Sequence, residues 1–429
     1  METTNDKPIL LLVAPLSSST VAKTFGEWKD SQDEYQLFHL ISKKGAKKYI
    51  EKNAEYFDNI LTCTFSDPDS IRKTLAPYKD KIIAASCRSE AKMWYYEKTI
   101  PQLPYLNAPT ESSLDWCVDK IQMRKRLASF NSEITPKFKV VDKYSKEMVD
   151  AIESHVAYPC VVKPSGLAQS LLVTICYHRE ELEESLKKVL KKTNILNRFY
   201  KESFDQSRPT VLVEEYMEGD QYSIDGVVDS VGKVSLYPPV YVKTGDKIGF
   251  DDFFGYMQMT PTKLKDASIA SMHDVAIQSV HALGLRSCSV HIELLRTEDG
   301  WKIIELGPRV GGFRQDLYDL SFGINCTSND FNIRLDLHPD LNRKVKGHTA
   351  FLKIFAKKEG KISSINGFKK VEALESLVRI KQAKQKGDRA KFAKNGGKAV
   401  FTMVMHNADR SKLLADVRRM EKELVINIE

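Results

Sequence analysis

The sequence has few cysteines and no long apolar run, and both absences limit what the protein can be. Its seven cysteines among 429 residues are widely scattered and never form a Cys-x-x-Cys pair, so neither a disulfide framework nor structural zinc is expected. The longest apolar stretch near the start, residues 9–16, is far too short to cross a bilayer, and its flanks lack a leader pattern. We therefore expect a reduced, cytoplasmic protein with no membrane partner.

The typical pattern of a nucleic-acid-binding protein is also missing. The formal net charge is +8, from 65 Lys and Arg against 57 Asp and Glu, but the lysines lie mainly in helical runs and near the C-terminus, without interleaved aromatic residues. Most of these lysines are expected on a solvated surface. The basic balance favours a polyanionic small ligand such as a nucleotide, and we expect no nucleic-acid partner.

The composition is that of a folded protein of several domains. Hydrophobic residues make up 42% and charged residues 28%, and at roughly 100 to 200 residues per domain the length allows two to four domains. Strand-like runs at 9–15, 35–41 and 81–85 with helical spacing between them predict a small parallel α/β domain. No Gly-x-Gly-x-x-Gly follows its first strand, so we interpret this domain as a scaffold and not as a dinucleotide site.

After residue 110 helices and strands follow in a different order. An apolar stripe of Leu114, Cys117, Val118 and Ile121 predicts one helix. Further strands are predicted at 157–163, 173–177, 211–213 and 222–228, and helices at about 180–192 and 266–283. The last region is predicted as a compact α+β cap with strands at 350–355 and 399–405 and a terminal helix.

A predicted hairpin places two acidic residues opposite one another. Two strand-like runs flank Glu298-Asp299-Gly300, a three-residue loop whose glycine can take the left-handed position. Closing the strands over this loop places Glu293 directly opposite Glu305, with both side chains on the same face. Facing carboxylates destabilise a sheet unless a hard cation or a shared proton compensates them. Magnesium bridged to phosphates is the favoured compensator; an exposed surface pair and a proton-sharing acid/base dyad are the alternatives.

Residues with anion-binding chemistry occur near this pair and upstream of it. The run Gly307-Pro308-Arg309-Val310-Gly311-Gly312 places an arginine beside the predicted metal and two glycines whose N–H groups can approach an oxyanion; an ordinary turn is the alternative. Lys163 ends a strand and Lys120 flanks a helix, so both amines can reach a phosphate. The run Glu214-Glu215-Tyr216-Met217 is either a hinge whose backbone pairs with adenine or a plain strand end.

Taken together and in this order, the motifs resemble the ATP-grasp superfamily over nearly the whole chain, and within it the L-amino-acid ligases and related carboxylate–amine ligases. The resemblance rests on Asp119-Lys120 near Met123-Arg124, Tyr-Pro-x-Val-Val-Lys-Pro at 158–164, Glu-Glu-Tyr-Met-Glu-Gly at 214–219, Tyr-Ser-Ile-Asp-Gly at 222–226, His-Ile-Glu at 291–293 and Glu-Leu-Gly-Pro-Arg at 305–309.

The resemblance implies a fold of α/β and α+β class with four parts. These are an N-terminal Rossmann-like pre-ATP-grasp domain at 1–110, a small ATP-grasp subdomain at 111–213, a large subdomain with the metal site at 214–345, and a lid-like α+β subdomain at 346–429. A homodimer through the N-terminal domain is in keeping with this family.

The resemblance also implies a role for each motif. The ATP-binding residues would be Lys120, Lys163 and Lys243 at the phosphates, Glu214 at the adenine amino group, Glu215 and Met217 in the hinge, and Gln221 at the ribose. The metal and substrate residues would be Glu293 and Glu305 for Mg²⁺, with Mn²⁺ as a substitute ion, Arg309, Gly311 and Gly312 at the acyl phosphate and oxyanion, and Arg314 at a substrate carboxylate. Residues 243–255 resemble the substrate-side loop of amino-acid ligases.

Two positions depart from the family pattern. The phosphate loop after Lys163 has one glycine where relatives often have several, so fewer N–H groups would cover the phosphates. Gly307 stands where the family usually has an asparagine that helps to bind a second magnesium ion.

The expected function is that of an ATP-dependent carboxylate–amine ligase. It would form an amide or peptide bond through an acyl phosphate, release ADP and phosphate, and take small carboxylate and amine substrates, in our interpretation amino acids or peptides. Two alternatives stay open: an ATP-grasp carboxylase or purine-pathway-like ligase, and an ATP-binding regulatory protein that has lost catalysis.

Overall fold

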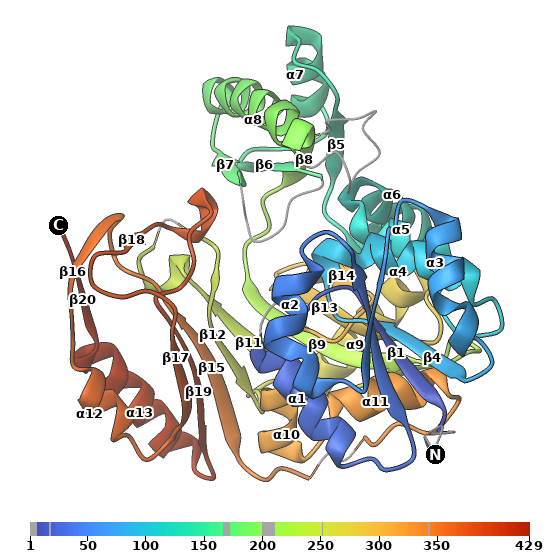
Figure 1. The fold of residues 1–429 in the computed structure, drawn as a ribbon. Coiled ribbons are helices and arrows are strands. Elements are labelled where there is room, and N and C mark those ends of the chain that lie inside the picture. The colour runs from blue at the N-terminus through green and yellow to red at the C-terminus, as the bar shows by residue number, and fades with distance from the viewer. Residues whose placement is uncertain (1–6, 17–18, 166–171, 200–210, 251, 342–343) are drawn as a thin grey trace.

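The computed structural model describes residues 7–16, 19–165, 172–199, 211–250, 252–341 and 344–429. Four sheets organise it: an N-terminal sheet, a small sheet that projects from the body, a central sheet of nine strands, and a three-stranded sheet near the C-terminus. Figure 1 shows the projecting lobe in green above the body and the N-terminal lobe in blue against the central sheet. No helix among the described residues is long and apolar enough to cross a membrane.

The N-terminal sheet confirms the predicted parallel α/β domain. Its strand order is β3-β2-β1-β4 and every pairing is parallel. All five residues of β1 are buried, as expected for a strand covered on both faces. The strands are β1 Ile9–Val13, β2 Gln36–Ser42, β3 Asn59–Cys63 and β4 Ile82–Cys87; the helices are α1 Ser19–Asp30, α2 Ala46–Asn53, α3 Pro68–Leu75 and α4 Met93–Thr99.

The single helix predicted after residue 110 was wrong, because Asp119 divides it. Helix α5 covers Glu111–Val118 and α6 covers Lys120–Phe130. Asp119 has extended backbone angles, and its carboxylate accepts hydrogen bonds from the amides of Ile121 and Gln122 at 2.8 and 3.4 Å. A side-chain N-cap of this kind starts a new helix. Lys120 therefore occupies the first turn of α6.

Helix α6 belongs to the core of the central sheet. Met123 and Leu127 pack with Met272 and Ala276 of α9 (Asp266–Ala282) in one hydrophobic cluster. Helix α6 thus packs with the large subdomain, although it was predicted with the small one, while Leu114 of α5 packs with the N-terminal domain. Only the part from β5 onward builds the projecting lobe.

The projecting lobe is a four-stranded antiparallel sheet with two helices. Its order is β5-β8-β6-β7, from β5 Phe138–Val141, β6 Cys160–Pro164, β7 Thr174–Cys176 and β8 Val211–Glu215. Helices α7 Lys146–Glu153 and α8 Arg179–Phe199 pack on it through Val149, Ile152, Leu182 and Leu186. Most of the glycine-poor phosphate loop, residues 166–170, lies outside the described residues.

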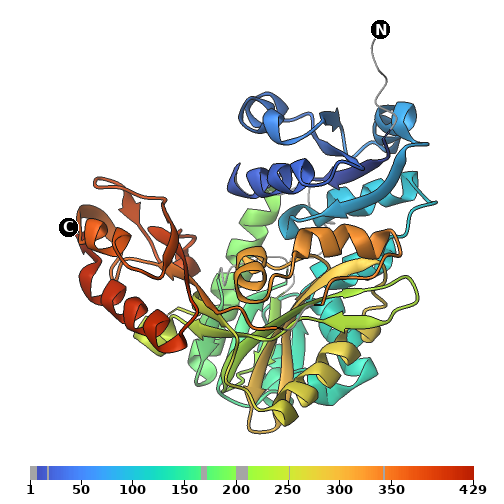
Figure 2. The same cartoon turned by 90° about the horizontal axis from the view of Figure 1, so that it is seen from below.

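The central sheet runs in the order β14-β13-β9-β11-β12-β15-β19-β17, with β10 paired to β9. Helix α9 packs on one face, and α10 Arg314–Phe322 and α11 Cys326–Arg334 pack on the other. Figure 2 shows these two helices between the sheet and the N-terminal lobe. The strands are β9 Asp220–Val228, β10 Val234–Leu236, β11 Val240–Thr244, β12 Gly255–Thr260, β13 Cys288–Thr297, β14 Gly300–Gly307, β15 His348–Ile354, β17 Leu377–Gln382 and β19 Phe401–Asn407.

The C-terminal region shares this sheet instead of standing apart from it. Strands β15, β17 and β19 continue the central sheet beyond β12. The remaining elements form the red lobe of Figure 1: β16 Gly360–Asn366, β18 Arg389–Ala390 and β20 Val425–Ile428 in a three-stranded sheet, with α12 Phe368–Glu372 and α13 Arg410–Glu423. Any movement of this lobe is therefore tied to the strands that carry the site.

The β13–β14 hairpin has the predicted acidic pair but not the predicted turn. Thr297 pairs with Gly300, so the loop has two residues, Glu298 and Asp299, instead of three. This register alone would put Glu293 opposite Ile304. A β-bulge between Leu294 and Glu293 leaves Ile304 without a partner and restores the pairing of Glu293 with Glu305.

Candidate active site

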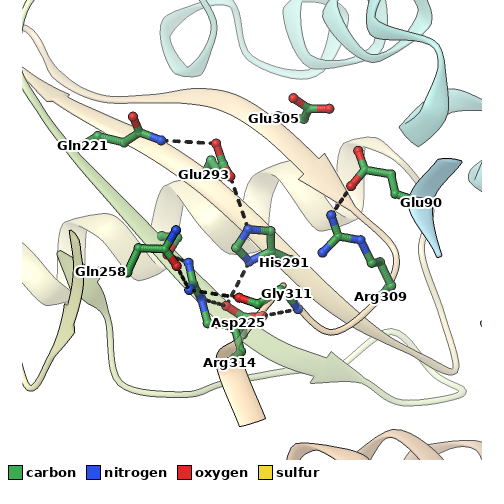
Figure 3. A network of polar contacts seen from close by, with 12 residues as sticks. Glu90, Gln221, Asp225, Gln258, His291, Glu293, Glu305, Arg309, Gly311 and Arg314 are labelled. Atoms are coloured by element: carbon green, nitrogen blue, oxygen red, sulfur yellow. Dashed lines mark hydrogen bonds and ion pairs between the residues drawn. The ribbon is translucent and has the colours of Figure 1, made fainter. Parts of the chain in front are cut away.

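The acidic pair lies on the face of the central sheet that α10 covers. Glu293 stands opposite Glu305 on β14 and opposite Ser223 on β9. Farther along the same face, Gln258 of β12 stands opposite Phe351 of β15. Figure 3 shows the carboxylates, the histidine beside them and the arginines converging above these strands. The sheet register therefore brings together groups that are far apart in the sequence.

Each member of the pair has its own polar partner. The Lys120 ammonium lies 2.9 Å from Oε1 of Glu305; burial opposes ionisation of this glutamate, but the lysine outweighs it and lowers the pKa of Glu305 to about 2. Glu293 accepts from Nε2 of Gln221 at 3.2 Å and lies 3.3 Å from Nε2 of His291. Gln221, predicted at the ribose, thus contacts the acidic pair in this structure.

The pair suits a magnesium ion that receives its other ligands from phosphates and water. Among the described residues there is no group of three or more His, Cys, Asp or Glu side chains placed to hold a metal. Mg²⁺ commonly binds through one or two carboxylates plus substrate phosphates, and both glutamates supply the hard oxygen donors it prefers. The donor set fits the ion and leaves its other coordination positions to phosphates and water.

A buried aspartate, Asp225 on β9, organises the surroundings of the pair. It is 1% exposed and accepts from the Gly311 amide at 2.8 Å and from Nε of Arg314 at 3.1 Å, and it lies 3.0 Å from Nδ1 of His291. Burial opposes its ionisation, but His291 and Arg314 outweigh this and lower the pKa of Asp225. The same contact raises the pKa of His291 against the effect of burial.

This arrangement changes the expected roles of two residues. The Gly311 N–H is already donated to Asp225, which leaves the N–H of Gly312 as the loop's candidate oxyanion donor. Arg314 is 2% exposed, and its guanidinium also bonds Gln258 and, at 2.6 Å, Ser223. A guanidinium so enclosed fits the support of the loop better than the predicted contact with a substrate carboxylate.

The N-terminal domain contributes to the site, contrary to its interpretation as a scaffold. Arg309, the predicted acyl-phosphate residue, forms an ion pair with Glu90, which follows β4. Ligands of parallel α/β sheets gather beyond the carboxyl ends of the strands. That rule is the signal by which the sequence could have indicated Glu90.

A second charge network joins α6 to the projecting lobe. Glu214, only 4% exposed, lies 2.6 Å from both Nε of Arg124 and Nζ of Lys163. Burial opposes ionisation of Glu214, but the two cations outweigh it and lower its pKa to about 2. Burial also lowers the pKa of Lys163 to about 8, although Glu214 opposes that shift. The adenine contact of Glu214 stays a prediction.

The other predicted nucleotide residues lie around this network. Glu215 accepts from the Lys137 amide at 3.2 Å, which holds the strand end, and Met217 lies two residues beyond the end of β8. Lys243, at the end of β11, has its ammonium 6.0 Å from the ring centre of Tyr256. Their roles toward ATP stay predictions.

Besides Glu90, three further site residues had no assigned role in the sequence reading. Asp225 and His291 belong to motifs that were noticed, but an interior aspartate and histidine have no distinguishing pattern of their own. Arg124 sits one turn after Lys120 on α6, and only the fold shows that it is buried. A same-face argument from strand periodicity would have grouped Asp225 with His291 once β9 was known to pair with β13.

With the geometry in place, comparison with known proteins shows what this chain is similar to. Residues 156–316 match the model of the ATP-grasp domain. An uncharacterized protein of Sinorhizobium fredii is 23% identical over 278 residues, 64% of this chain and 54% of that protein. D-alanine–D-alanine ligase of a Thermoanaerobacter species is 27% identical over 199 residues, 43% of this chain and 48% of that protein. The chain spans about half the length of these curated relatives.

The solved structures agree on the fold. L-amino acid ligase from Bacillus licheniformis has a TM-score of 0.76 to this structure at 17% identity, over 99% of both chains. Residues 156–316 are thus similar to the ATP-grasp domain, and the overall fold is similar to that of L-amino acid ligase.

The loop glycines provide a matched test of the Asp225 network. A Cβ at Gly311 would come within 2.5 Å of Nδ1 of His291 and 2.8 Å of Oδ1 of Asp225, whereas a Cβ at Gly312 would meet nothing within 4 Å. We expect Gly311→Ala to lower the free energy of unfolding by about 1 to 3 kcal/mol, the usual effect of overpacking. Gly312→Ala should leave it nearly unchanged. Urea unfolding measures both, and equal midpoints would contradict the described loop packing.

The lowered pKa of Lys163 predicts a pH-dependent affinity for ATP. If the protonated amine attracts the phosphates, affinity should fall as the pH rises through about 8, by up to about tenfold per pH unit. The Lys163→Arg variant should not show this fall in ATP affinity, because arginine stays protonated. Calorimetric titration of ATP from pH 7 to 9.5 measures the effect.

Unfolding does not explain such a loss. The folded-state pKa of Lys163 lies below its unfolded value, so between pH 8 and about 10.5 the unfolded state binds more protons, and this group's contribution to stability rises with pH. Identical pH profiles for the wild type and Lys163→Arg would show that Lys163 is not the titrating group.

Proposed function

We propose that the protein is an ATP-dependent carboxylate–amine ligase that forms an amide or peptide bond through an acyl phosphate. The observation that carries the proposal is the register of the β13–β14 hairpin, which sets Glu293 against Glu305. This acidic pair lies beside one cation that can reach phosphates, Lys120, and the loop from Gly307 to Gly312 continues directly from it.

The nucleotide end of the site is built from cations that already face carboxylates. Lys120 and Lys163 would exchange their contacts with Glu305 and Glu214 for phosphate oxygens when ATP binds. Glu293 and Glu305 would hold magnesium, which supplies positive charge to the phosphates. Neutralising the triphosphate is the main task of a phosphoryl-transfer site, since positioning and charge dominate its catalysis.

The acyl end of the site would carry out the two chemical steps. A substrate carboxylate oxygen attacks the γ-phosphorus in line, the bond to the bridging oxygen breaks, and ADP leaves. An amine then attacks the acyl carbon, loses a proton, and the phosphate leaves. Arg309 would hold the acyl phosphate after leaving Glu90, and the Gly312 N–H would stabilise the tetrahedral oxyanion.

The relatives support amino acids or peptides as substrates. The names of D-alanine–D-alanine ligase and L-amino acid ligase describe enzymes that join amino acids. We propose the same substrate class for the present chain. A carboxylase-like or purine-pathway-like ligase shares the fold and is the alternative reaction. A homodimer through the N-terminal domain stays a prediction.

Release of ADP and phosphate from ATP and Mg²⁺, with pooled amino acids as acids and amines, tests the proposal directly. We expect ADP to form only with particular acid–amine pairs, and mass spectrometry to identify the condensed product. ATP binding without turnover across the pool would favour the regulatory alternative.

Replacing one carboxylate of the pair tests the metal assignment. Glu305→Gln keeps the side-chain shape but removes the charge, so kcat should fall at least about 100-fold without loss of the fold. Glu298→Gln, in the turn of the same hairpin, is the matched control and should keep wild-type turnover. An unchanged kcat in Glu305→Gln would contradict the assignment of the metal to this pair.

Restoring the family residue at position 307 tests whether catalysis is weakened there. A Cβ at Gly307 would meet only the Arg309 side chain, at 3.7 to 3.8 Å, so a larger residue fits. Gly307→Asn adds an oxygen donor beside the pair, and we expect half-maximal activity at a severalfold lower Mg²⁺ concentration. If the wild type were silent and the variant turned over ATP, the regulatory alternative would hold for the natural chain. An unchanged Mg²⁺ requirement would show that position 307 does not face the metal.

A further inference from the structure

Beyond the glycine loop, the site face carries a lysine from the C-terminal region. Lys353 follows Phe351 by two residues on β15, so both side chains lie on the face that holds Gln258 and the acidic pair. Four strand pairings separate β15 from β13. Burial lowers the pKa of Lys353, and the negative charge of Glu293 partly opposes this shift.

The ammonium of Lys353 lies beside the residue that follows the loop glycines. It is 6.0 Å from the ring centre of Phe313, which is 41% exposed and stacks on Phe351 with centroids 3.7 Å apart. Over the described ranges, no hydrogen bond or ion pair to the Lys353 ammonium is found. Burial lowers its pKa, as expected for a cation whose charge is poorly compensated.

Lys353 differs in this respect from five other cations of the site. Each of those has a carboxylate partner within ion-pair distance: Lys120 with Glu305, Lys163 and Arg124 with Glu214, Arg309 with Glu90, and Arg314 with Asp225. A half-buried ammonium without such a partner is stabilised when an anion binds next to it.

The order of groups along the face indicates which anion this is. The acidic pair and Arg309 serve the phosphates and the reacting carboxylate, and Gly312 serves the oxyanion. In the strand order, β9, β11 and β12 separate the strand of Lys353, β15, from the strands of the acidic pair. The attacking amine would approach the acyl phosphate from this side. The acid substrate uses its carboxylate in the reaction, so a second carboxylate at this place belongs to the amine substrate.

We propose that Lys353 binds the carboxylate of the amine substrate, which makes that substrate a free amino acid or a peptide with a free C-terminus. This inference rests on the proposed function and deepens it. The loop glycine, the aromatic ring and the ammonium then form one binding surface for the amine substrate, with the charge supplied by the C-terminal region.

Lys353→Met tests the inference with paired substrates, an amino acid and its α-carboxamide. In the wild type the amino acid should be the better amine by roughly 10- to 100-fold in kcat/KM, the size of a charge-assisted contact. Lys353→Met should lose this preference, mainly through a higher KM for the amino acid, while turnover of the carboxamide and the KM for ATP stay unchanged. Lys353→Arg should keep part of the preference.

Lys361→Met is the matched control, since this exposed lysine of the same region pairs with Glu429. It should behave as the wild type does with both substrates. Equal losses for amino acid and carboxamide in Lys353→Met would reveal a structural role and overturn the inference. A raised KM for ATP would make phosphate the ligand of Lys353, with the same consequence.

A binding measurement separates this inference from the proposed function. If the wild type turns over no acid–amine pair, the proposed function fails, and ligand-observed NMR with L-alanyl-L-alanine and its C-terminal amide then tests Lys353 alone in the ADP–Mg²⁺-loaded protein. Binding of the free dipeptide that is lost in Lys353→Met supports the carboxylate contact. Equal binding by both proteins, or no discrimination between dipeptide and amide, overturns it.

Discussion

Arg124 makes the contact on which the geometry of the site depends. This buried side chain of α6 donates to Glu214 of β8 and, at 2.7 Å, to the carbonyl of Ile304, the residue that the bulge in β14 leaves without a strand partner. An unpaired carbonyl would be costly in this interior. Because the arginine satisfies it, the bulge is stable, and the bulge turns Glu305 to the face of Glu293. A register shifted by one residue would have sent that carboxylate to the opposite face.

The charges of the site are arranged as pairs that a substrate can exchange. Lys120 with Glu305 and Lys163 with Glu214 each place a cation against a carboxylate that is costly to bury alone. In the proposed function, ATP phosphates would replace the carboxylate partners of both lysines, and magnesium would replace Lys120 beside Glu305. The folded protein can therefore hold a dense set of charges before any ligand arrives.

Asp225 has a structural role: its partners hold the loop in place, and we expect them to keep these contacts when a ligand binds. It joins β9 to His291 of β13, to the Gly311 amide and to Arg314 of α10, and no solvent reaches it. It thus holds the loop glycines at a constant place relative to the acidic pair. Arg309 and Glu90 add a contact across the domain boundary, so the N-terminal domain takes part in the site and does more than support it.

The sequence by itself determined the parallel N-terminal sheet, the hairpin of β13 and β14 and the residue types of the site, because hydrophobic periodicity and motif order are local properties. It also paired Glu293 with Glu305, although through a three-residue loop that the chain does not have. It did not indicate β11 and β12, which connect this hairpin to the C-terminal strands. Only the tertiary structure decided the bulge, the break at Asp119, the enclosure of Arg314 and the half-buried charge of Lys353 without an ion-pair partner. Each of these features depends on contacts between elements that are distant in the sequence. The energy of a buried charge depends on its neighbours in those contacts, so no local sequence pattern predicts it.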